Sequence, residues 1–142
     1  MNRECVFCKI IRRELPSHRI YEDSRSYAFL DINPINAGHT LVVPKRHVSR
    51  FSELTDSEAG HLFSVGKKIL NAIEASDVIC EGANLFLSDG PVAGQEVMHS
   101  HLHIAPRFEN DGHKMGFSHS DPEQAKPAKM AEVADSISRA LK

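Results

Sequence analysis

The sequence lacks several features that would point to specialised classes of protein. It has no tryptophan, few aromatic residues (6%) and three cysteines among 142 residues, too few for the disulfide framework of a small secreted domain. The formal net charge of -2 gives no overall reason to expect binding to nucleic acid or to an anionic membrane. No apolar run approaches the ~20 residues that span a bilayer, and no signal peptide is evident. We therefore expect a cytoplasmic protein.

The residues that are present are typical of one folded domain. Hydrophobic residues make up 41% of the chain and charged residues 25%, which is ordinary for a globular protein. No internal repeat, low-complexity linker or shift in composition divides the sequence. We expect a single domain over residues 1–142.

Hydrophobic periodicity and turn residues predict an α+β fold. A long amphipathic core helix is expected over Thr55–Ser76, with Thr55 and Glu58 as its capping box. A short helix is expected over Cys8–Leu15, and a C-terminal helix after Asp121-Pro122 follows a surface loop over residues 108–120. Strands are predicted at His18–Glu22, Tyr27–Ile32, Leu41–Val43, Asn84–Ser88 and Val97–Ala105.

Three histidines alternate along the last predicted strand, at positions 99, 101 and 103. The two-residue period of a strand would place all three imidazoles on one face. A solvated edge strand, a metal site and nucleophilic catalysis all remain open. Same-face neighbours on a strand are about 6.6–7 Å apart, so three rings reach one ion with difficulty. A neutral imidazole is a nucleophile at cellular pH, which makes catalysis the preferred interpretation.

A Cys-x-x-Cys pair, Cys5 and Cys8, lies near the N-terminus. From the spacing alone it can be half of a structural zinc site, a redox pair or two unconnected thiols. Cys80 stands apart from both, and we expect it to be a buried small hydrophobe.

The segment Gly94–Arg107 resembles the signature of the histidine triad (HIT) family, in which histidines alternate with hydrophobic residues. Ala28–Asp31 followed by Pro34, then Gly38–His47, and the opening Cys5–Ile11 also resemble this family in the right order. The resemblance covers about residues 4–107 and leaves the loop and C-terminal helix, residues 108–142, outside it. It implies a HIT-like fold with a five-stranded, mainly antiparallel sheet, a long core helix, a short N-terminal helix and a C-terminal helix, in a homodimer.

The resemblance also implies a nucleotide hydrolase or nucleotidyl transferase that acts at the α-phosphate of an adenosine or other purine compound. His101 would be the nucleophile and would form a covalent nucleotidyl-histidine intermediate. A nucleoside monophosphate would be released from a nucleoside phosphoramidate or a dinucleoside polyphosphate, with no metal required for the chemical step. The other catalytic histidines would be His103, His39 and His99. The alternative is a non-catalytic nucleotide-binding regulatory or adaptor protein.

Further residues acquire binding roles through the same resemblance. Asp31 would bind the ribose hydroxyls as a double acceptor, and Gln95 would reach the phosphate or the leaving group. Ser88 stands where relatives commonly carry an amide, and Glu96 stands where several carry a hydroxyl. Strand alternation should turn the Glu96 side chain away from His101. The candidate nucleotide-binding residues are Asp31, Phe7, Phe29, Ile32, Ser88, Gln95, Glu96, Val97 and His103.

For the cysteine pair, the resemblance supplies two further ligands, His47 and His99. Together with Cys5 and Cys8 they would form a closed, tetrahedral structural Zn²⁺ site that joins the N-terminal turn to the histidine strand.

Overall fold

The computed structural model describes residues 3–116 and 121–141. Contacts divide the chain into two compact units, Met1–Gly112 and His113–Lys142. The two units are described separately below, and the single domain over residues 1–142 stays a prediction.

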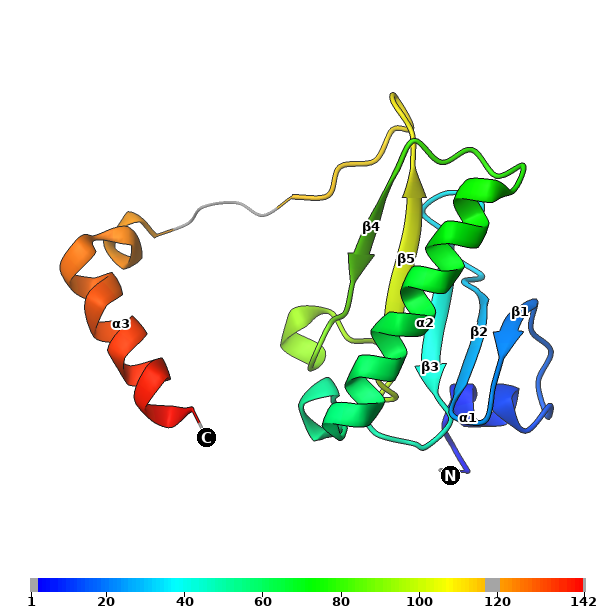
Figure 1. Cartoon of the computed structure of the whole chain (residues 1–142), viewed down its shortest axis with the longest axis horizontal. Coiled ribbons are helices and arrows are strands. Elements are labelled where there is room, and N and C mark those ends of the chain that lie inside the picture. The colour runs from blue at the N-terminus through cyan, green and yellow to red at the C-terminus, as the bar shows by residue number, and fades with distance from the viewer. Residues whose placement is uncertain (1–2, 117–120, 142) are drawn as a thin grey trace. The chain divides into compact units, whose positions relative to one another are not determined.

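A five-stranded antiparallel sheet forms the centre of the first unit (Figure 1). Its strands lie in the order β1-β2-β3-β5-β4, so that β5 lies between β3 and β4. All neighbouring pairs are antiparallel, and the predicted α+β fold with a five-stranded sheet is confirmed. The strands are β1 (Arg19–Glu22), β2 (Ser26–Leu30), β3 (Thr40–Pro44), β4 (Gly82–Phe86) and β5 (Leu102–Arg107).

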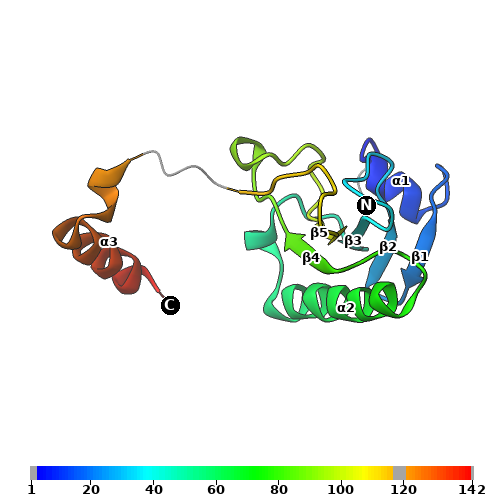
Figure 2. The ribbon, with the colours of Figure 1, turned by 90° about the horizontal axis from the view of Figure 1, so that it is seen from above.

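The long helix α2 (Asp56–Ala75) covers one face of the sheet (Figure 2). It begins at Thr55, whose side chain accepts from the Glu58 N–H while the Glu58 carboxylate accepts from the Thr55 N–H, as predicted. Its buried apolar stripe packs on the sheet because alternate strand residues point to this side. This core consists of Leu62, Val65, Ile69 and Ile73 of α2 with Ala28, Val42, Leu102 and Ile104 of the sheet.

The short helix α1 (Val6–Ile11) lies on the opposite face. It starts two residues earlier than predicted because the Cys5 side chain caps it by accepting from the Cys8 N–H. It also ends earlier, since Arg13 has a φ of 64°. The second core joins Phe7, Ile10 and Ile11 of this helix to Tyr27, Phe29, Leu41 and Val43.

The predicted strand Val97–Ala105 is wrong in its first half. The strand β5 begins only at Leu102, and residues 97–101 form a bend and an irregular segment before it. One reason is that the Ser100 N–H donates to the carbonyl oxygen of Val48, in the loop that follows β3. Strict alternation of side chains therefore does not extend back from β5 to His99.

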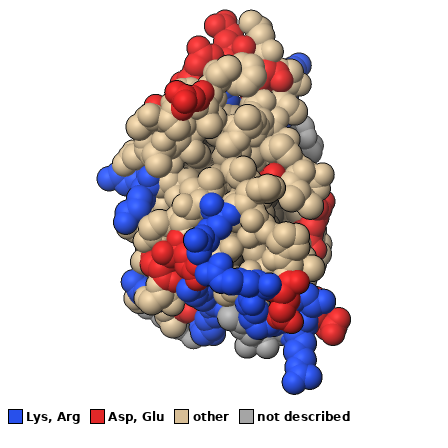
Figure 3. Space-filling model, turned by 90° about the vertical axis from the view of Figure 1, so that its right-hand side faces the viewer, with Lys and Arg blue, Asp and Glu red and all other residues tan. Residues whose placement is uncertain are grey.

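Basic and acidic side chains are interleaved on the face of this unit that includes β1 (Figure 3). Glu22 accepts from Arg13 and Arg19, each at 2.9 Å, and from Lys45 at 2.8 Å. The hydrogen bond from Lys45 is the main cause that lowers the pKa of Glu22 to about 2. The basic groups around β1 are therefore already paired with a carboxylate.

The second unit contains the C-terminal helix α3 (Pro127–Ala140). Asp121 caps a short 3-10 turn at Pro122–Ala125, so the α-helix itself starts five residues after Pro122. Its apolar residues at helical spacing, Met130, Val133 and Ile137, are exposed. Residues 117–120 of the predicted surface loop lie outside the described residues. Among the described helices, none has the length and apolar character needed to cross a membrane.

Candidate active site and metal centre

A cavity of about 390 Å³ opens on the sheet face that carries α1. This volume is within the range of small-molecule sites. Apolar side chains, among them Phe7, Phe29 and Ile32, share its lining with His101 and His103. The predicted residues Asp31, Glu96 and Val97 also line it. The cavity therefore offers apolar walls together with groups that can act on a phosphoryl centre.

His101 lies immediately before β5, with its side chain almost fully buried (7% exposed). Its Nδ1 lies 2.7 Å from the backbone oxygen of His99. A carbonyl oxygen only accepts, so Nδ1 carries the proton and Nε2 holds a free lone pair. Burial lowers the pKa of His101, against an opposing effect of the Asp31 and Glu96 carboxylates. The ring is therefore a neutral imidazole with a nucleophilic Nε2.

A chain of hydrogen bonds fixes the proton on His103. The Ile35 N–H donates to His39 Nδ1 at 3.0 Å, so neutral His39 carries its proton on Nε2. His39 Nε2 then donates to His103 Nδ1, also at 3.0 Å. The proton of neutral His103 is left on Nε2. Burial is the main cause that lowers the pKa of His103 to about 4.

Phe86, on β4, packs against the ring of His103, a contact that was not predicted from the sequence. The two rings stack with centroids 4.3 Å apart and planes 6° from parallel. They are directly opposite in the register of β4 and β5. Phe86 and His103 would be identified as neighbours if the register between β4 and β5 were known. The sequence does not provide this register, and the predicted strand Asn84–Ser88 is shifted by two residues from β4.

Asp31 follows β2 and lies beside the histidine pair. Its Oδ1 accepts from the Asn33 N–H at 2.9 Å, and its Oδ2 lies 3.6 Å from His39 Nε2. One oxygen therefore holds the turn after β2, while the carboxylate still lines the cavity.

Three further predicted nucleotide-binding residues are Gln95, Ser88 and Glu96. Gln95 is buried, and its amide is used internally: Oε1 accepts from the Gly90 N–H while Nε2 donates to the carbonyl oxygens of Ser49 and Val97. Ser88 is not among the described residues that line the cavity. Glu96 is one of the lining residues. Gln95 thus holds the loop, and Glu96 on that loop lies at the cavity.

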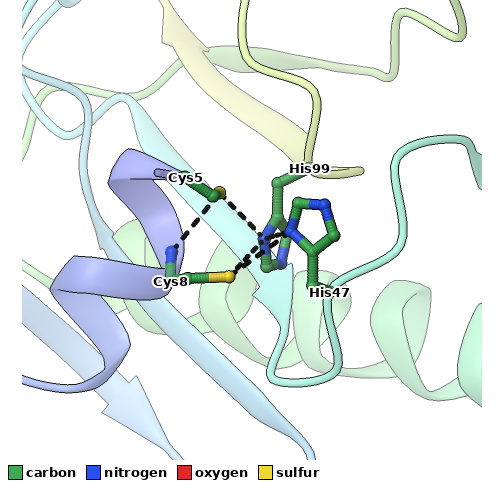
Figure 4. A group of neighbouring side chains, drawn as sticks. All are labelled: Cys5, Cys8, His47 and His99. Atoms are coloured by element: carbon green, nitrogen blue, oxygen red, sulfur yellow. Dashed lines mark hydrogen bonds between the residues drawn. The ribbon is translucent and has the colours of Figure 1, made fainter. Parts of the chain in front are cut away.

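His99 points away from the cavity, so the prediction of three imidazoles on one face is wrong for this residue. Its Nε2 donates to the carbonyl oxygen of Pro44 at 2.7 Å. Its Nδ1 is therefore unprotonated and faces Cys5, Cys8 and His47 (Figure 4). A metal-binding histidine usually donates its other ring N–H to a carbonyl or carboxylate in this way. The backbone carbonyl of His99 thus accepts from His101, whereas its side chain contacts the two cysteines.

The four side chains Cys5, Cys8, His47 and His99 have the spacing of a tetrahedral zinc site. In a regular tetrahedron of Zn²⁺ ligands, two nitrogens lie about 3.3–3.4 Å apart, and a nitrogen and a sulfur about 3.5–3.6 Å. The two histidine Nδ1 atoms are 3.3 Å apart. The Cys5–His99, Cys8–His47 and Cys8–His99 distances are 3.4, 3.4 and 3.6 Å. Two thiolates and two imidazoles in this arrangement fit zinc in a closed, structural site.

Comparisons with known proteins agree with this architecture. The family model of the HIT domain matches residues 12–110. The chain is 43% identical to an uncharacterized HIT-like protein of Borreliella burgdorferi over 136 residues, which cover 95% of this chain and 96% of the relative. A crystal structure of a HIT family member from Bacillus subtilis superposes with a TM-score of 0.89 at 37% identity and covers 98% of both chains.

Other relatives carry names that state an activity or a ligand. An adenosine 5′-monophosphoramidase of Candida albicans is 35% identical, and the aligned region covers 72% of this chain and 70% of the relative. An adenylylsulfatase of Arabidopsis thaliana is 40% identical, and the aligned region covers 78% of this chain and 56% of the relative. A zinc-bound histidine triad family protein of Mycobacterium smegmatis superposes with a TM-score of 0.75 at 35% identity, covering 94% and 97% of the two chains.

Proposed function

This chain belongs to the HIT domain family, and on that premise we propose that it is a nucleotidyl hydrolase or transferase. It acts at the α-phosphate of a purine nucleotide and releases a nucleoside monophosphate. The observation that carries the proposal is the pair of fixed proton positions in the cavity. His101 presents a lone pair on Nε2, and His103 presents an N–H on Nε2.

In the first step, His101 Nε2 attacks the α-phosphorus and the bond to the leaving group breaks. With a phosphoramidate, the electron pair of the P–N bond leaves with the nitrogen, which takes up a proton from solvent. The imidazole gains positive charge as the N–P bond forms. The hydrogen bond from Nδ1 to the His99 carbonyl, already 2.7 Å long, then becomes charge-assisted and stronger. His103 Nε2–H donates to a phosphate oxygen.

In the second step, water attacks the phosphorus of the nucleotidyl-histidine. The bond to His101 breaks with its electron pair returning to Nε2, and water gives up the proton that the first step consumed. The sum of both steps is hydrolysis to a nucleoside monophosphate and an amine. Splitting the displacement in two allows an imidazole to replace water as the first nucleophile.

The nucleotide itself has matching groups in the cavity. Phe7 and Phe29, which meet edge to face at 5.4 Å, form an apolar wall for the base. Asp31 accepts from the ribose hydroxyls, and Val97 borders the phosphate. Neither Gln95 nor Ser88 is assigned a contact with the nucleotide.

Zinc belongs to the proposal as a structural ion held by Cys5, Cys8, His47 and His99. Its chemistry there is cross-linking, since all four positions of a tetrahedron are taken by side chains. His99 is a zinc ligand in this proposal and acts on His101 only through its carbonyl oxygen.

The homodimer and the cytoplasmic location stay predictions. The strands β1 and β4 form the two edges of the described sheet, so a dimer that joins two sheets would pair one of these edges with its copy.

The experiment that tests the function compares the wild type with His101→Ala and, as a matched control, His18→Ala, which removes an exposed histidine outside the cavity. With adenosine 5′-phosphoramidate, we expect AMP from the wild type and the control. His101→Ala should lose activity by about 10³-fold or more while the protein remains folded. Mass spectrometry without acid should detect the nucleotidyl group on the peptide that contains His101.

Near-normal activity of His101→Ala would refute the nucleophile. If neither phosphoramidate nor diadenosine tetraphosphate yields product while AMP raises the melting temperature, the protein is a nucleotide-binding module without turnover.

A further inference from the structure

The charges that line the cavity all have one sign. Among the described lining residues, Asp31 and Glu96 are acidic, and none is a lysine or an arginine. The lining histidines, His101 and His103, contribute no positive charge while they are neutral. A substrate that carries several phosphates would find no cationic side chain from these residues.

The two carboxylates differ in what they already contact. Asp31 accepts from the Asn33 N–H and lies beside His39. Glu96 is exposed at the cavity, and within residues 3–116 and 121–141 no hydrogen bond or ion pair engages its carboxylate. Other carboxylates of this unit do have basic partners: Glu58 pairs with Arg46 at 2.6 Å, and Glu22 with Lys45 at 2.8 Å.

The loop that carries Glu96 is held in place. The buried Gln95 makes three side-chain hydrogen bonds to the backbone on both sides of it, at Gly90, Ser49 and Val97. Val97, the next residue, lines the cavity with Glu96. Glu96 thus lines the cavity on a fixed loop segment, and its carboxylate is near enough to His101 to act in the direction that raises the pKa of that imidazole.

We propose that Glu96 selects the leaving group by its charge. On the proposed function, the preferred substrate is a nucleoside 5′-phosphoramidate whose departing amine bears a second, cationic ammonium group close to the scissile P–N bond. The amine departs with the electron pair of that bond and a proton from solvent, while its ammonium group pairs with the Glu96 carboxylate. Neutral amines are less favoured, and the anionic chain of a dinucleoside polyphosphate is least favoured because Glu96 repels it.

The test uses two adenosine 5′-phosphoramidates of almost equal size. One is made with ethylenediamine, whose free end is an ammonium at neutral pH, and the other with propylamine, which has a methyl group in its place. Diadenosine tetraphosphate is the third substrate. The value of kcat/KM is measured for the wild type, for Glu96→Gln and for the control Glu74→Gln, which removes an exposed carboxylate of α2 outside the cavity.

The ratio of kcat/KM for the ethylenediamine compound to kcat/KM for the propylamine compound includes the different basicity of the two amines, so the change of this ratio on substitution is the measure of Glu96. We expect the ratio to be about three- to tenfold higher in the wild type and in Glu74→Gln than in Glu96→Gln, as for a charge pair at a partly solvated site. In Glu96→Gln, diadenosine tetraphosphate should improve relative to the propylamine compound. A ratio that Glu96→Gln leaves unchanged would overturn the inference and leave the proposed function intact.

Binding to His101→Ala separates the two proposals if no substrate is turned over. Dissociation constants of the same two amides, measured by calorimetry, should differ in the same direction and lose the difference when Glu96→Gln is added. Absence of turnover counts against the proposed function, whereas equal dissociation constants count against the role of Glu96.

Discussion

At the scale of single residues, the hydroxyl of Ser100 has an unusual environment. The side chain is 1% exposed, and its Oγ is a buried polar atom without a hydrogen-bond partner among the described residues. An unsatisfied buried hydroxyl costs about 1–3 kcal/mol. The backbone N–H of the same residue is used, since it donates to Val48.

Ser100→Ala should therefore raise the free energy of unfolding by about 1 kcal/mol, because it removes the unpaired hydroxyl and keeps the backbone bond. Urea denaturation measures the change. Thr40→Val is the matched control: it deletes a fully buried hydroxyl that donates to the Gly38 carbonyl at 2.8 Å, and it should lower stability. A Ser100→Ala protein less stable than the wild type would contradict this interpretation.

Single residues also show where prediction from sequence succeeds. His101 and His103 were predicted to lie on one face, and both line the cavity. This was predictable because the two residues are close in sequence and lie at the start of β5. The side-chain bonds of Gln95 depend on Gly90 and Ser49, and no local pattern indicates that this amide will be buried and hold a loop. The expected orientation of Glu96 rests on strand alternation, which does not apply there because residues 95–101 are not in a strand.

At the scale of elements, α2 approaches the sheet closely at Gly66. A Cβ atom there would lie 2.7 Å from Leu102 Cδ2, in the core. A Cβ atom on Gly60, in the same helix, would have no atom within 4 Å. The two glycines share a helix and differ in the space around them.

This contrast predicts opposite effects of one substitution. Gly60→Ala should stabilise the protein by up to about 1 kcal/mol through helix propensity. Gly66→Ala should lower the free energy of unfolding by about 1–2 kcal/mol. The cost of overpacking against the fully buried Leu102 is larger than the gain in helix propensity. Urea midpoints should move in opposite directions. A shift of the same sign in both variants would mean that α2 can move away from Leu102.

The proposed zinc ion would join three segments: the start of α1, the loop after β3 and the residues before β5. Protein expressed with added zinc should contain about one ion per chain by elemental mass spectrometry, and Cys8→Ala should contain almost none. Cys80→Ser, outside the cluster, should retain it. Because the ion binds only the folded arrangement, chelation should lower the melting temperature. A wild type that retains its melting temperature after complete removal of metal would exclude a structural role.

Elements also show the limits of local reasoning. The helix α2 was predictable because its capping box and apolar period are local. The start of α1 was not, since it depends on a cysteine acting as its cap. The bend over residues 97–101 arises from two distant groups, the Val48 carbonyl and the cysteines that His99 faces.

At the scale of the whole molecule, several groups titrate differently in the folded and unfolded states. The pKa values of Asp23 and Glu58 are lowered to about 2. For Glu58 the main cause is its hydrogen bond from Arg46. For Asp23 burial is the largest single effect and raises the pKa, but the hydrogen bonds from Arg25, Tyr21 and Ser26 together outweigh it. Glu22 is lowered in the same way as Glu58, by a basic partner.

Because these folded-state pKa values lie below the ordinary ones, the unfolded chain binds more protons at acid pH, and stability falls as pH falls from about 5 to about 2. His103 has a pKa of about 4 in the folded protein, so it contributes a further loss of stability as the pH falls below its ordinary value of 6.5. Melting temperatures at pH 7, 5, 4 and 3 should decrease in that order. In Glu58→Gln the decrease below pH 5 should be smaller, and in Glu74→Gln unchanged. A constant melting temperature over this range would contradict the assigned shifts.

The hydrogen bonds that orient His103 begin at the main chain, at the Ile35 N–H. A carboxylate in that place could be lost by mutation or neutralised by acid, whereas every amino acid except proline supplies a peptide N–H with no pKa in the physiological range. The residue at position 35 can therefore change without reversing the proton positions on His39 and His103. The donor is a backbone N–H whose position depends on the conformation of the main chain, so the side chain at position 35 is free to vary.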